Sequence, residues 1–362
     1  MQTKAYASEP EVSARAAICV DAETFGIIFE KNADEKLPMA STTKIITAIT
    51  AIENGDLNDI VTVSANAAGT EGSSIWLEPG EKLTLSELLY SLMLESGNDA
   101  AVAIAEHISG SEEAFSSLMN ETCKKAGAVS TSCVTASGLD DINHYTTARD
   151  LALISRYALH NEDFKKIVST KSCTIPWQGK DWGRALENHN KMLKSYDGAV
   201  GVKTGYTKKS GRCLVSAADR GELETIVVTL NDPDDWSDHK KLLDYSFEKY
   251  TSLKSILKEG AAAGSIEVSG SKERVSYSPE RSLSLRECET PLEVTLKYNI
   301  EDKVDAPVEK GDILGSVDVY NNGLYITSVN LSASGNAEKN DLSYAYKERY
   351  IFLIKTLLEL MR

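Results

Sequence analysis

The order of strand-like and helix-like segments constrains the fold of this chain more than any single motif does. Residues 15–32 contain two apolar, β-rich runs that Ala22–Thr24 joins into a hairpin. Helical periodicity follows to about Ala126 and returns at Asp150–Ala158. Three short extended runs, "GAVGVKTGYT", "GRCLVSAAD" and "LETIVVTL", then form a meander before a final helix at about 236–250. This order predicts a mixed α+β domain in which an antiparallel sheet packs with a helical block.

The remainder of the chain has a different pattern. From 264 to about 336, short alternating segments such as "SIEVSG" and "LEVTLKYN" are separated by turn residues, which is typical of a small all-β domain. The last segment, "YKERYIFLIKTLLELMR", carries polar residues on one helical face and apolar residues on the others. We therefore expect three parts, with residues 1–253 as the α+β domain, 254–340 as a small β-sandwich and 341–362 as an amphipathic C-terminal helix.

The composition disfavours two classes of binding site. The 362 residues include 54 acidic and 39 basic side chains, a formal net charge of -15, so nucleic acid is not an expected partner. The histidines lack the spacing of metal ligands, no CxxC pair occurs, and the acidic stretch "NDPDDWSD" lacks the central glycine of a calcium loop. We therefore expect a solvated acidic loop there, with neither a metal nor a cofactor.

The cysteines and the N-terminus bear on the cellular compartment. The six cysteines are widely spread, and a chain of this length can build a core without disulfides, so we expect most of them to be buried thiols. No apolar run of signal-peptide length follows Met1, yet "AYASEPEVS" resembles the small-residue tail around a signal cleavage site. This favours a mature, exported protein.

The stretch "LPMASTTKIITAIT" places a serine three residues before a lysine near the start of a helix. Pro38 and Gly55 bound the segment, so we expect one helix over Ser41–Glu53. An apolar stripe runs along this helix: Ile45, Ala48, Ile49 and Ile52. Lys44 can therefore reach the Ser41 hydroxyl beside the stripe, and burial would lower the lysine pKa until its amine accepts the serine proton. The alternative is a serine N-cap with a lysine that reaches solvent.

Two further short motifs lie in the same domain. A capping box at Thr84 and Glu87 begins the helix that precedes Ser96–Asn98 ("SGN"). Lys203–Gly205 ("KTG") lies on one run of the meander, which we expect to be an inner strand. Each motif alone fits a turn or a strand end equally well. Together with Ser41–Lys44 ("STTK"), their order and placement match the motif set of active-site serine β-lactamases and penicillin-binding proteins.

Longer blocks extend this resemblance. The segments "VSARAAICVDAETFGIIFEKNADEKLPMASTTK", "SLMLESGNDAAVAIAEHISGS", "SGLDDINHYTTARDLALISRYAL" and "DGAVGVKTGYTKKSGRCLVSA" look like successive blocks of the D-alanyl-D-alanine carboxypeptidases, the low-molecular-mass penicillin-binding proteins. The β domain and the tail are also similar in kind and order, so the resemblance covers nearly the whole chain. One departure is visible. Relatives can place an arginine near the pocket for the substrate carboxylate, where this chain offers His189, Asp234 and Asp235.

The resemblance implies a serine-type carboxypeptidase that removes the terminal D-alanine from peptidoglycan stem peptides. Ser41 would attack the carbonyl between two D-alanines, Lys44 would accept its proton, and Ser96 would relay a proton to the leaving nitrogen. Water would then hydrolyse the acyl-enzyme. A β-lactam mimics the substrate and would acylate the same serine.

The resemblance also implies a set of substrate-binding residues: Asn98, Lys203, Thr204, Gly205 and Tyr206. Asn98 would hold the peptide backbone of the substrate, and Gly205 would let that backbone approach. Lys203 would stay cationic and, with Thr204, would bind the terminal carboxylate. The backbone N–H groups of Ser41 and Tyr206 would form the oxyanion hole.

Two other functions share some of these features. A serine β-lactamase has the three motifs, although an accessory β domain and a tail would be surplus to it. A non-catalytic protein that binds cell-wall peptides would need no Ser41 with Lys44. Turnover of a D-alanyl-D-alanine peptide separates the three functions.

The C-terminal segment bears on where the protein acts. Its longest uncharged run is shorter than the roughly 20 apolar residues that a membrane-spanning helix needs. Because carboxypeptidases of this kind commonly end in an amphipathic anchor, the resemblance implies peripheral attachment to the outer face of the bacterial cytoplasmic membrane. The alternative is a helix that packs on the β domain.

Overall fold

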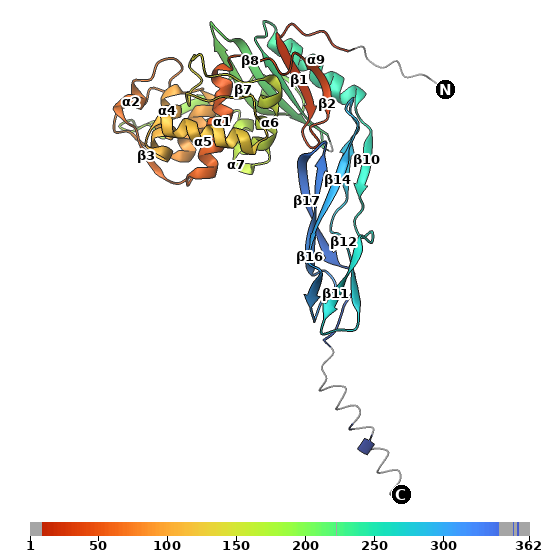
Figure 1. Ribbon diagram of the computed structural model, residues 1–362. Coiled ribbons are helices and arrows are strands. Elements are labelled where there is room, and N and C mark those ends of the chain that lie inside the picture. The colour runs from red at the N-terminus through yellow and green to blue at the C-terminus, as the bar shows by residue number, and fades with distance from the viewer. Residues whose placement is uncertain (1–8, 222, 340–349, 351–352, 355–362) are drawn as a thin grey trace. The chain divides into compact units, whose positions relative to one another are not determined.

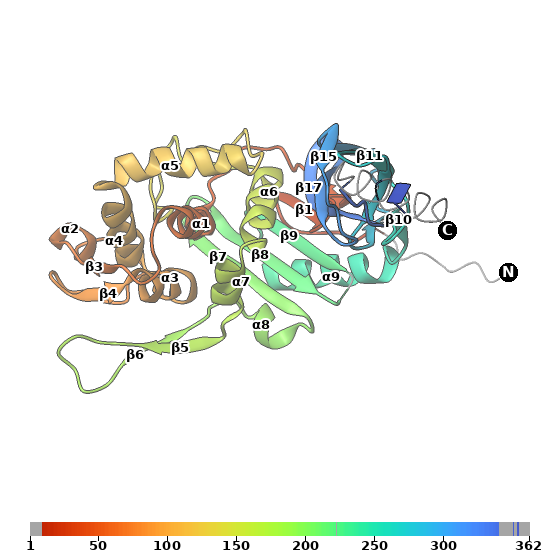
Figure 2. The same cartoon turned by 90° about the horizontal axis from the view of Figure 1, so that it is seen from below.

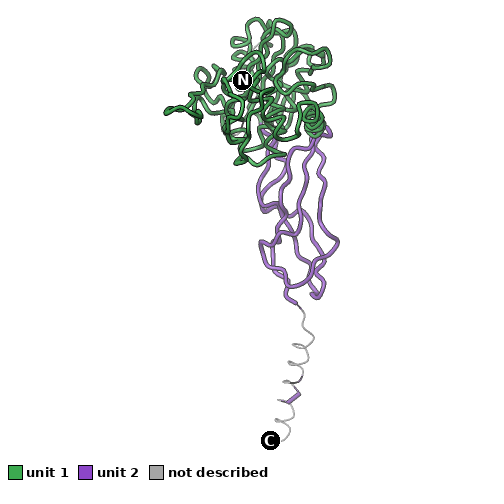
Figure 3. The backbone as a smooth tube through the Cα atoms, turned by 90° about the vertical axis from the view of Figure 1, so that its left-hand side faces the viewer, with its two compact units in different colours: residues 1–252, 286–291 green, residues 253–285, 292–362 purple. Residues whose placement is uncertain are grey.

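The chain forms two compact units, which are described here from a computed structural model. The structure describes residues 9–221, 223–339, 350 and 353–354. Unit 1 comprises Met1–Ser252 with Arg286–Pro291, and unit 2 comprises Leu253–Leu285 with Leu292–Arg362 (Figure 3).

A five-stranded antiparallel sheet forms the centre of unit 1, in the order β2-β1-β9-β8-β7. Its strands are β1 (Ala16–Asp21), β2 (Ile27–Lys31), β7 (Ala199–Thr207), β8 (Gly211–Asp219) and β9 (Glu224–Leu230). The predicted N-terminal hairpin thus joins the meander through the pairing of β1 with β9. The "KTG" strand, β7, lies at the edge of the sheet, so its expected inner position is wrong.

Helices surround this sheet (Figures 1 and 2). They are η1 (Ala40–Thr43), α1 (Lys44–Asn54), α2 (Ala65–Ala68), α3 (Leu85–Leu94), α4 (Asn98–Ser109), α5 (Glu112–Lys125), α6 (Ala148–Leu159), α7 (Glu162–Ser169), α8 (Met192–Ser195) and α9 (Asp235–Lys249). Two short antiparallel pairs complete the unit, β3 (Ile60–Thr62) with β4 (Lys82–Thr84) and β5 (Ser172–Ile175) with β6 (Arg184–Glu187).

The strand alternation of β1 divides the apolar core into two layers. Ile18 and Val20 pack in the core that contains α1 and the other helices of the block, whereas Cys19 packs with Leu242 and Leu243 of α9. This is the period of two expected for a strand that is covered on both faces. The sheet therefore lies between the helical block and α9.

Helix α1 runs through the helical block and is buried from Lys44 to Ala51. The chain enters it through the 3-10 turn η1, so the single helix expected over Ser41–Glu53 is corrected to a 3-10 turn followed by an α-helix. Ala40 begins this turn with a positive φ of 48°, a conformation that L-residues adopt rarely. The predicted capping box of α3 is present, with Thr84 and Glu87 bonded to each other's backbone.

Residues 253–339 form β-strands joined by turns, as the alternating segments predict. A six-stranded sheet has the order β14-β16-β17-β12-β11-β15, and β10 pairs with β13. The strands are β10 (Leu253–Leu257), β11 (Gly264–Ser269), β12 (Arg274–Pro279), β13 (Leu283–Arg286), β14 (Val294–Ile300), β15 (Lys303–Asp305), β16 (Ile313–Asn321) and β17 (Leu324–Ala333).

Two of the predictions concern the N-terminal and C-terminal ends of the chain. The first four residues of the segment "AYASEPEVS" (5–13) lie outside the described residues. The amphipathic helix expected over 341–362 also lies outside them, except at Tyr350, Leu353 and Ile354. In the part of the chain that the structure describes, we find no helix with the length and apolarity needed to cross a bilayer.

Candidate active site

Lys44 is the centre of the candidate site. Its side chain is fully buried, and its Nζ lies 3.0 Å from Ser41 Oγ. The same Nζ contacts Asn98 Oδ1 at 2.7 Å and the carbonyl oxygen of Ser137 at 2.6 Å. The first and second sequence motifs are thus joined through one amine, with a backbone carbonyl as its third partner.

Burial changes the protonation of this lysine. Desolvation, together with the nearby charge of Lys203, lowers the pKa of Lys44 well below its usual value, while Asp99 opposes the shift. A lysine with a depressed pKa can hold a lone pair at neutral pH, so its Nζ can accept the proton of the Ser41 hydroxyl. The desolvated lysine expected from the apolar stripe of α1 is therefore observed.

The second motif forms the tight connection between α3 and α4. Ser96 is buried and has a positive φ of 62°, and Asn98 begins α4. The Asn98 Nδ2 donates to the Glu71 carbonyl at 2.7 Å, and its backbone N–H donates to the Ser73 carbonyl at 2.7 Å. These bonds, with the contact to Lys44, fix which end of the Asn98 amide faces the lysine.

Asp99 supports the wall beside Asn98, and no motif singled it out. It is fully buried, and its carboxylate accepts from Ser74 Oγ at 2.6 Å and from the backbone N–H groups of Ile75 and Leu77. The loop that supplies acceptors to Asn98 is therefore held by the next residue of the same helix. Acidic residues are common in the first turn of a helix. The sequence alone therefore does not distinguish Asp99 from an ordinary residue at a helix start.

The third motif lies on the edge strand. Lys203 is fully buried, and desolvation lowers its pKa to about 7, opposed by Glu95. The sequence-based expectation was that Lys203 stays cationic. This pKa corrects that expectation, because a lysine with such a pKa is only partly protonated at neutral pH. Its Nζ donates to the Thr204 carbonyl at 3.2 Å.

Gly205 brings β7 against the turn that carries Ser41. A Cβ added to this glycine would lie 3.0 Å from the backbone nitrogens of both Ser41 and Thr42. The absent side chain thus allows a close approach between β7 and η1. The following residue, Tyr206, has a 66% exposed side chain.

A second supporting loop, residues 137–144, packs behind η1. Gly138 has a φ of 86°, and a Cβ there would lie 2.1 Å from the Ala40 carbonyl oxygen. His144 Nε2 lies 2.7 Å from Thr43 Oγ1, and its Nδ1 accepts from the Val134 N–H at 3.0 Å. Since Nδ1 accepts, the Nε2 of the neutral ring carries the hydrogen. Burial lowers the pKa of His144 to about 4, which keeps this arrangement neutral.

Of the three candidates for the carboxylate pocket, two are held by charged side chains. His189 Nε2 lies 3.2 Å from Glu95 Oε2. Asp235 is paired with Arg212, whose Nη2 lies 2.7 Å from its Oδ1. Asp234 is the residue before α9 and lies on the surface.

The described residues include no group of three or more His, Cys, Asp or Glu side chains that could hold a metal ion. All six cysteines are free thiols, and four of them are buried.

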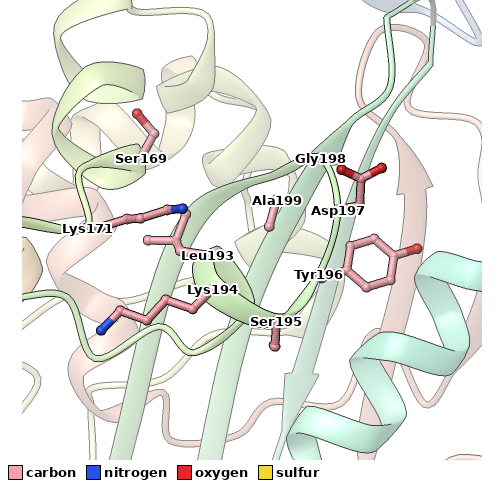
Figure 4. Close-up of a pocket in the computed structure, with 9 residues that line it drawn as sticks. All are labelled: Ser169, Lys171, Leu193, Lys194, Ser195, Tyr196, Asp197, Gly198 and Ala199. Carbon is pink, nitrogen blue, oxygen red and sulfur yellow. The ribbon is translucent and has the colours of Figure 1, made fainter.

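Two cavities lie in unit 1. One of about 410 Å³ lies at the start of β7, where Lys171, Lys194 and Asp197 are among its lining residues, and none of the motif residues lines it (Figure 4). The other, of about 450 Å³, is lined by the loop that includes Glu71 and therefore lies beside Asn98.

Comparisons with known proteins agree with this geometry. The sequence profile described as "D-alanyl-D-alanine carboxypeptidase" matches residues 3–234, which hold all three motifs. The chain belongs to the D-alanyl-D-alanine carboxypeptidase family. The profile of the penicillin-binding protein 5 C-terminal domain matches residues 252–339.

Curated relatives cover almost the whole chain. The D-alanyl-D-alanine carboxypeptidase DacF of Bacillus subtilis is 32% identical over 343 residues, which are 92% of this chain and 88% of that protein. The D-alanyl-D-alanine carboxypeptidase DacC of Escherichia coli is 32% identical over 349 residues, which are 91% of this chain and 86% of that protein.

Solved structures show the same fold. Penicillin-binding protein 5 from Haemophilus influenzae aligns with a TM-score of 0.67 and 26% identity, covering 92% of this chain and 99% of that chain. A peptidoglycan synthesis regulatory factor, PBP3, from Streptococcus pneumoniae aligns with a TM-score of 0.73 and 26% identity, covering 91% and 100%. The predicted function, a serine-type D-alanyl-D-alanine carboxypeptidase of the penicillin-binding proteins, is therefore confirmed.

Proposed function

We propose that Ser41 is the nucleophile with which this carboxypeptidase removes the terminal D-alanine, and that Lys44 is its base. The observation that carries this assignment is the contact of one buried, pKa-depressed amine with both Ser41 and Asn98. The Ser41 proton moves to Lys44 Nζ while Oγ bonds to the carbonyl carbon of the penultimate residue. Collapse of the tetrahedral intermediate breaks the C–N bond, and water later hydrolyses the ester.

In this proposal Ser96 acts on the leaving group, and Asn98 acts on the part of the substrate that stays bound to the enzyme. Ser96 relays a proton to the departing amine. The location of Ser96 in the turn that leads directly into α4, beside Asn98, supports this role. Asn98 holds the peptide backbone of the substrate. Its amide is already fixed between Lys44 and the Glu71 carbonyl, so little freedom is lost when substrate binds.

The oxyanion hole comprises the backbone N–H groups of Ser41 and Tyr206. The support is the close approach of Gly205 to the Ser41 nitrogen, because the Tyr206 nitrogen is the next backbone atom but one after the Gly205 Cα. Two N–H groups that meet at one point can stabilise the developing negative charge, and the loss of one such donor typically costs about a hundredfold or more in rate.

Lys203 and Thr204 bind the terminal carboxylate of the substrate. With a pKa of about 7, Lys203 is partly neutral in the free enzyme, and a bound carboxylate would raise its pKa by favouring the charged form. Substrate binding therefore takes up a proton near neutral pH. An amidated D-alanyl-D-alanine peptide should be a much poorer substrate than the free acid.

For the rest of the chain we propose the three parts expected from the sequence. Residues 1–253 are the catalytic domain, 254–340 a β-sandwich, and 341–362 an amphipathic helix that lies on the outer face of the cytoplasmic membrane. The family's action on peptidoglycan supports an extracytoplasmic site.

Full-length protein should sediment with liposomes, whereas a version that ends at Asn340 should stay in the supernatant and cleave a small peptide. Failure of both forms to bind lipid would refute the anchor.

One experiment tests the catalytic assignment. Intact-mass analysis after exposure to penicillin should show one acyl adduct, and a parallel assay should show D-alanine release from a D-alanyl-D-alanine peptide. Both signals should disappear in Ser41→Ala. Labelling that persists in this variant would assign the nucleophile to another residue, and rapid β-lactam turnover without D-alanine release would favour a β-lactamase.

A further inference from the structure

Trp76 is a large apolar side chain that the fold leaves in solvent. Its side chain is 76% exposed, although its neighbours Ile75 and Leu77 are both buried. Its φ is 61°, a left-handed conformation that a bulky L-residue adopts rarely. The indole gains no burial from this conformation, so packing of the apolar core does not account for it. Backbone strain of this kind is concentrated at sites that bind ligands.

The backbone on both sides of Trp76 is held by side chains. The N–H groups of Ile75 and Leu77 each donate to the Asp99 carboxylate at 3.1 Å. The N–H of Trp76 itself donates to Ser74 Oγ at 2.8 Å. Because these contacts fix the backbone, the direction in which the indole leaves the loop is also fixed.

Arg184 of β6 holds the same residue through its carbonyl. Its Nη2 donates to the Trp76 carbonyl at 3.4 Å, and its Nη1 lies 3.1 Å from Glu81 Oε1 in a buried ion pair. The guanidinium also lies 4.7 Å from the centroid of the Trp177 ring. The loop and the β5–β6 hairpin thus support each other, and little conformational freedom remains to be lost when a ligand binds to the exposed ring.

The exposed ring lies close to the residue that we propose to hold the substrate. The carbonyls of Glu71 and Ser73 accept from the Asn98 side chain and backbone, both at 2.7 Å. Trp76 is three residues beyond Ser73, so the Cα atoms of these two residues are at most about 11 Å apart. A few residues of extended peptide, at about 3.3–3.6 Å each, span that distance. A substrate held at Asn98 can therefore reach the indole with its more distant part.

The cavity of about 450 Å³ lies along this loop, and its lining includes Trp76, Glu71, Ser74 and Glu78. An aromatic face beside carboxylate and hydroxyl oxygens suits a sugar ring. The C–H groups on one face of such a ring stack on the indole, while its hydroxyl and amide groups donate to the carboxylates. The two exposed glutamates disfavour an anionic ligand, such as the phosphate of a lipid headgroup.

We propose that Trp76, with Glu71 and Glu78, forms a subsite for a sugar ring of the glycan strand to which the stem peptide is attached. This proposal rests on the carboxypeptidase function proposed above. The subsite makes a glycan-linked stem peptide a better substrate than the same peptide without sugar, and it takes no part in bond cleavage.

The test compares D-alanine release from a stem peptide that ends in D-alanyl-D-alanine with release from the same peptide linked to its disaccharide. The wild type should prefer the linked substrate. In Trp76→Ala, kcat/KM for this substrate should fall about three- to tenfold, the scale of one aromatic stacking contact. The kcat/KM for the free peptide and the rate of acylation by penicillin should stay unchanged, because neither molecule carries a sugar.

Two variants serve as controls. Trp76→Tyr keeps an aromatic face and should retain most of the preference for the linked substrate. Trp182→Ala removes another tryptophan, which is 64% exposed and lies outside the lining of the cavity, and it should change neither kcat/KM value. If Trp76→Ala does not fold, Trp76→Gly is measured in the same way and with the same outcomes, because glycine adopts a positive φ without strain.

Several results would overturn the subsite. They are equal cleavage of both substrates by the wild type, equal losses for both substrates in Trp76→Ala, and equal losses in Trp76→Ala and Trp182→Ala. If the wild type releases no D-alanine from either substrate, the proposed function fails instead.

Discussion

Lys44 Nζ lies 3.0 Å from Ser41 Oγ where the 3-10 turn η1 becomes helix α1. Ser41 in the turn is half-buried, whereas Lys44, the first residue of the helix, is fully buried. The nucleophile and the amine thus occupy different environments although they are three residues apart. Burial of the amine is what lowers its pKa.

Replacement of Lys44 should stop acylation without preventing folding. In Lys44→Ala the Ser41 hydroxyl loses its proton acceptor, and the acylation rate with penicillin should fall by about a hundred- to ten-thousandfold. Time-resolved intact mass measures this rate, and circular dichroism checks the fold. Lys209→Ala, an exposed lysine near the site, is the control. Near-wild-type acylation would make Lys44 a structural residue.

Gly205 should tolerate no side chain. An alanine Cβ would lie 3.0 Å from the nitrogens of Ser41 and Thr42, so β7 or η1 must shift. We expect Gly205→Ala to destabilise the fold by about 1–3 kcal/mol and to slow acylation about a hundredfold. The control is Gly335→Ala, which has no heavy atom within 4 Å of the added Cβ. Equal acylation rates in the two variants would show that this approach is not needed for catalysis.

His144 should make stability depend on pH below neutrality. Its pKa is about 4 in the folded protein against 6.5 for an unperturbed histidine, so between these values the unfolded chain binds the proton and the folded chain does not. Stability must then fall as the pH falls from 6.5 to 4, by roughly 3 kcal/mol from this residue.

Urea unfolding at a series of pH values tests this contribution, with His144→Gln as the comparison. The variant has no proton to bind at this position and should lose less stability on acidification than the wild type does. Buried His239, whose pKa is lowered to about 3, acts in the same direction in both proteins and cancels in the comparison. Parallel curves would mean that His144 is protonated equally in both states.

Lys203 should make the stability of the fold depend on pH above neutrality. The folded pKa of about 7 lies below the 10.5 of an ordinary lysine, so between these pH values the unfolded chain is protonated and the folded chain is not. Stability from this residue therefore rises as the pH rises from 7 to 10.5. Lys203→Met should raise Tm more at pH 7 than at pH 10, because the cost of the buried amine is larger at the lower pH. A constant difference would refute the depressed pKa.

Much of the site could be predicted because its parts are short local patterns. The spacing of Ser41 and Lys44, the turn at Ser96–Asn98 and the small residue at Gly205 each have a local physical reason, and their order along the chain favours one family. The roles of these residues stay proposals.

Other features depend on contacts between distant segments. Asp99 acts on a loop that precedes it by more than twenty residues, and His144 acts on Thr43 across a much longer separation. Arg212 gains its orientation from Asp235 on a later helix. No local pattern distinguishes such residues from ordinary surface or core positions. The reduced charge of Lys203 was missed for the same reason, since its burial depends on packing around an edge strand.

The position of β7 at the sheet edge has a consequence for self-association. Helices α7 and α8 pack against this strand, and Val168 contacts Gly201 near its start. Among the described residues no strand pairs with the outer side of β7, so only the part of this strand that the helices leave uncovered can offer backbone groups. An open edge of a few residues accepts the end of a short peptide, but it is too short for the strand of another protein molecule to pair stably. The enzyme can thus keep backbone donors open to substrate with little risk of aggregation along that edge.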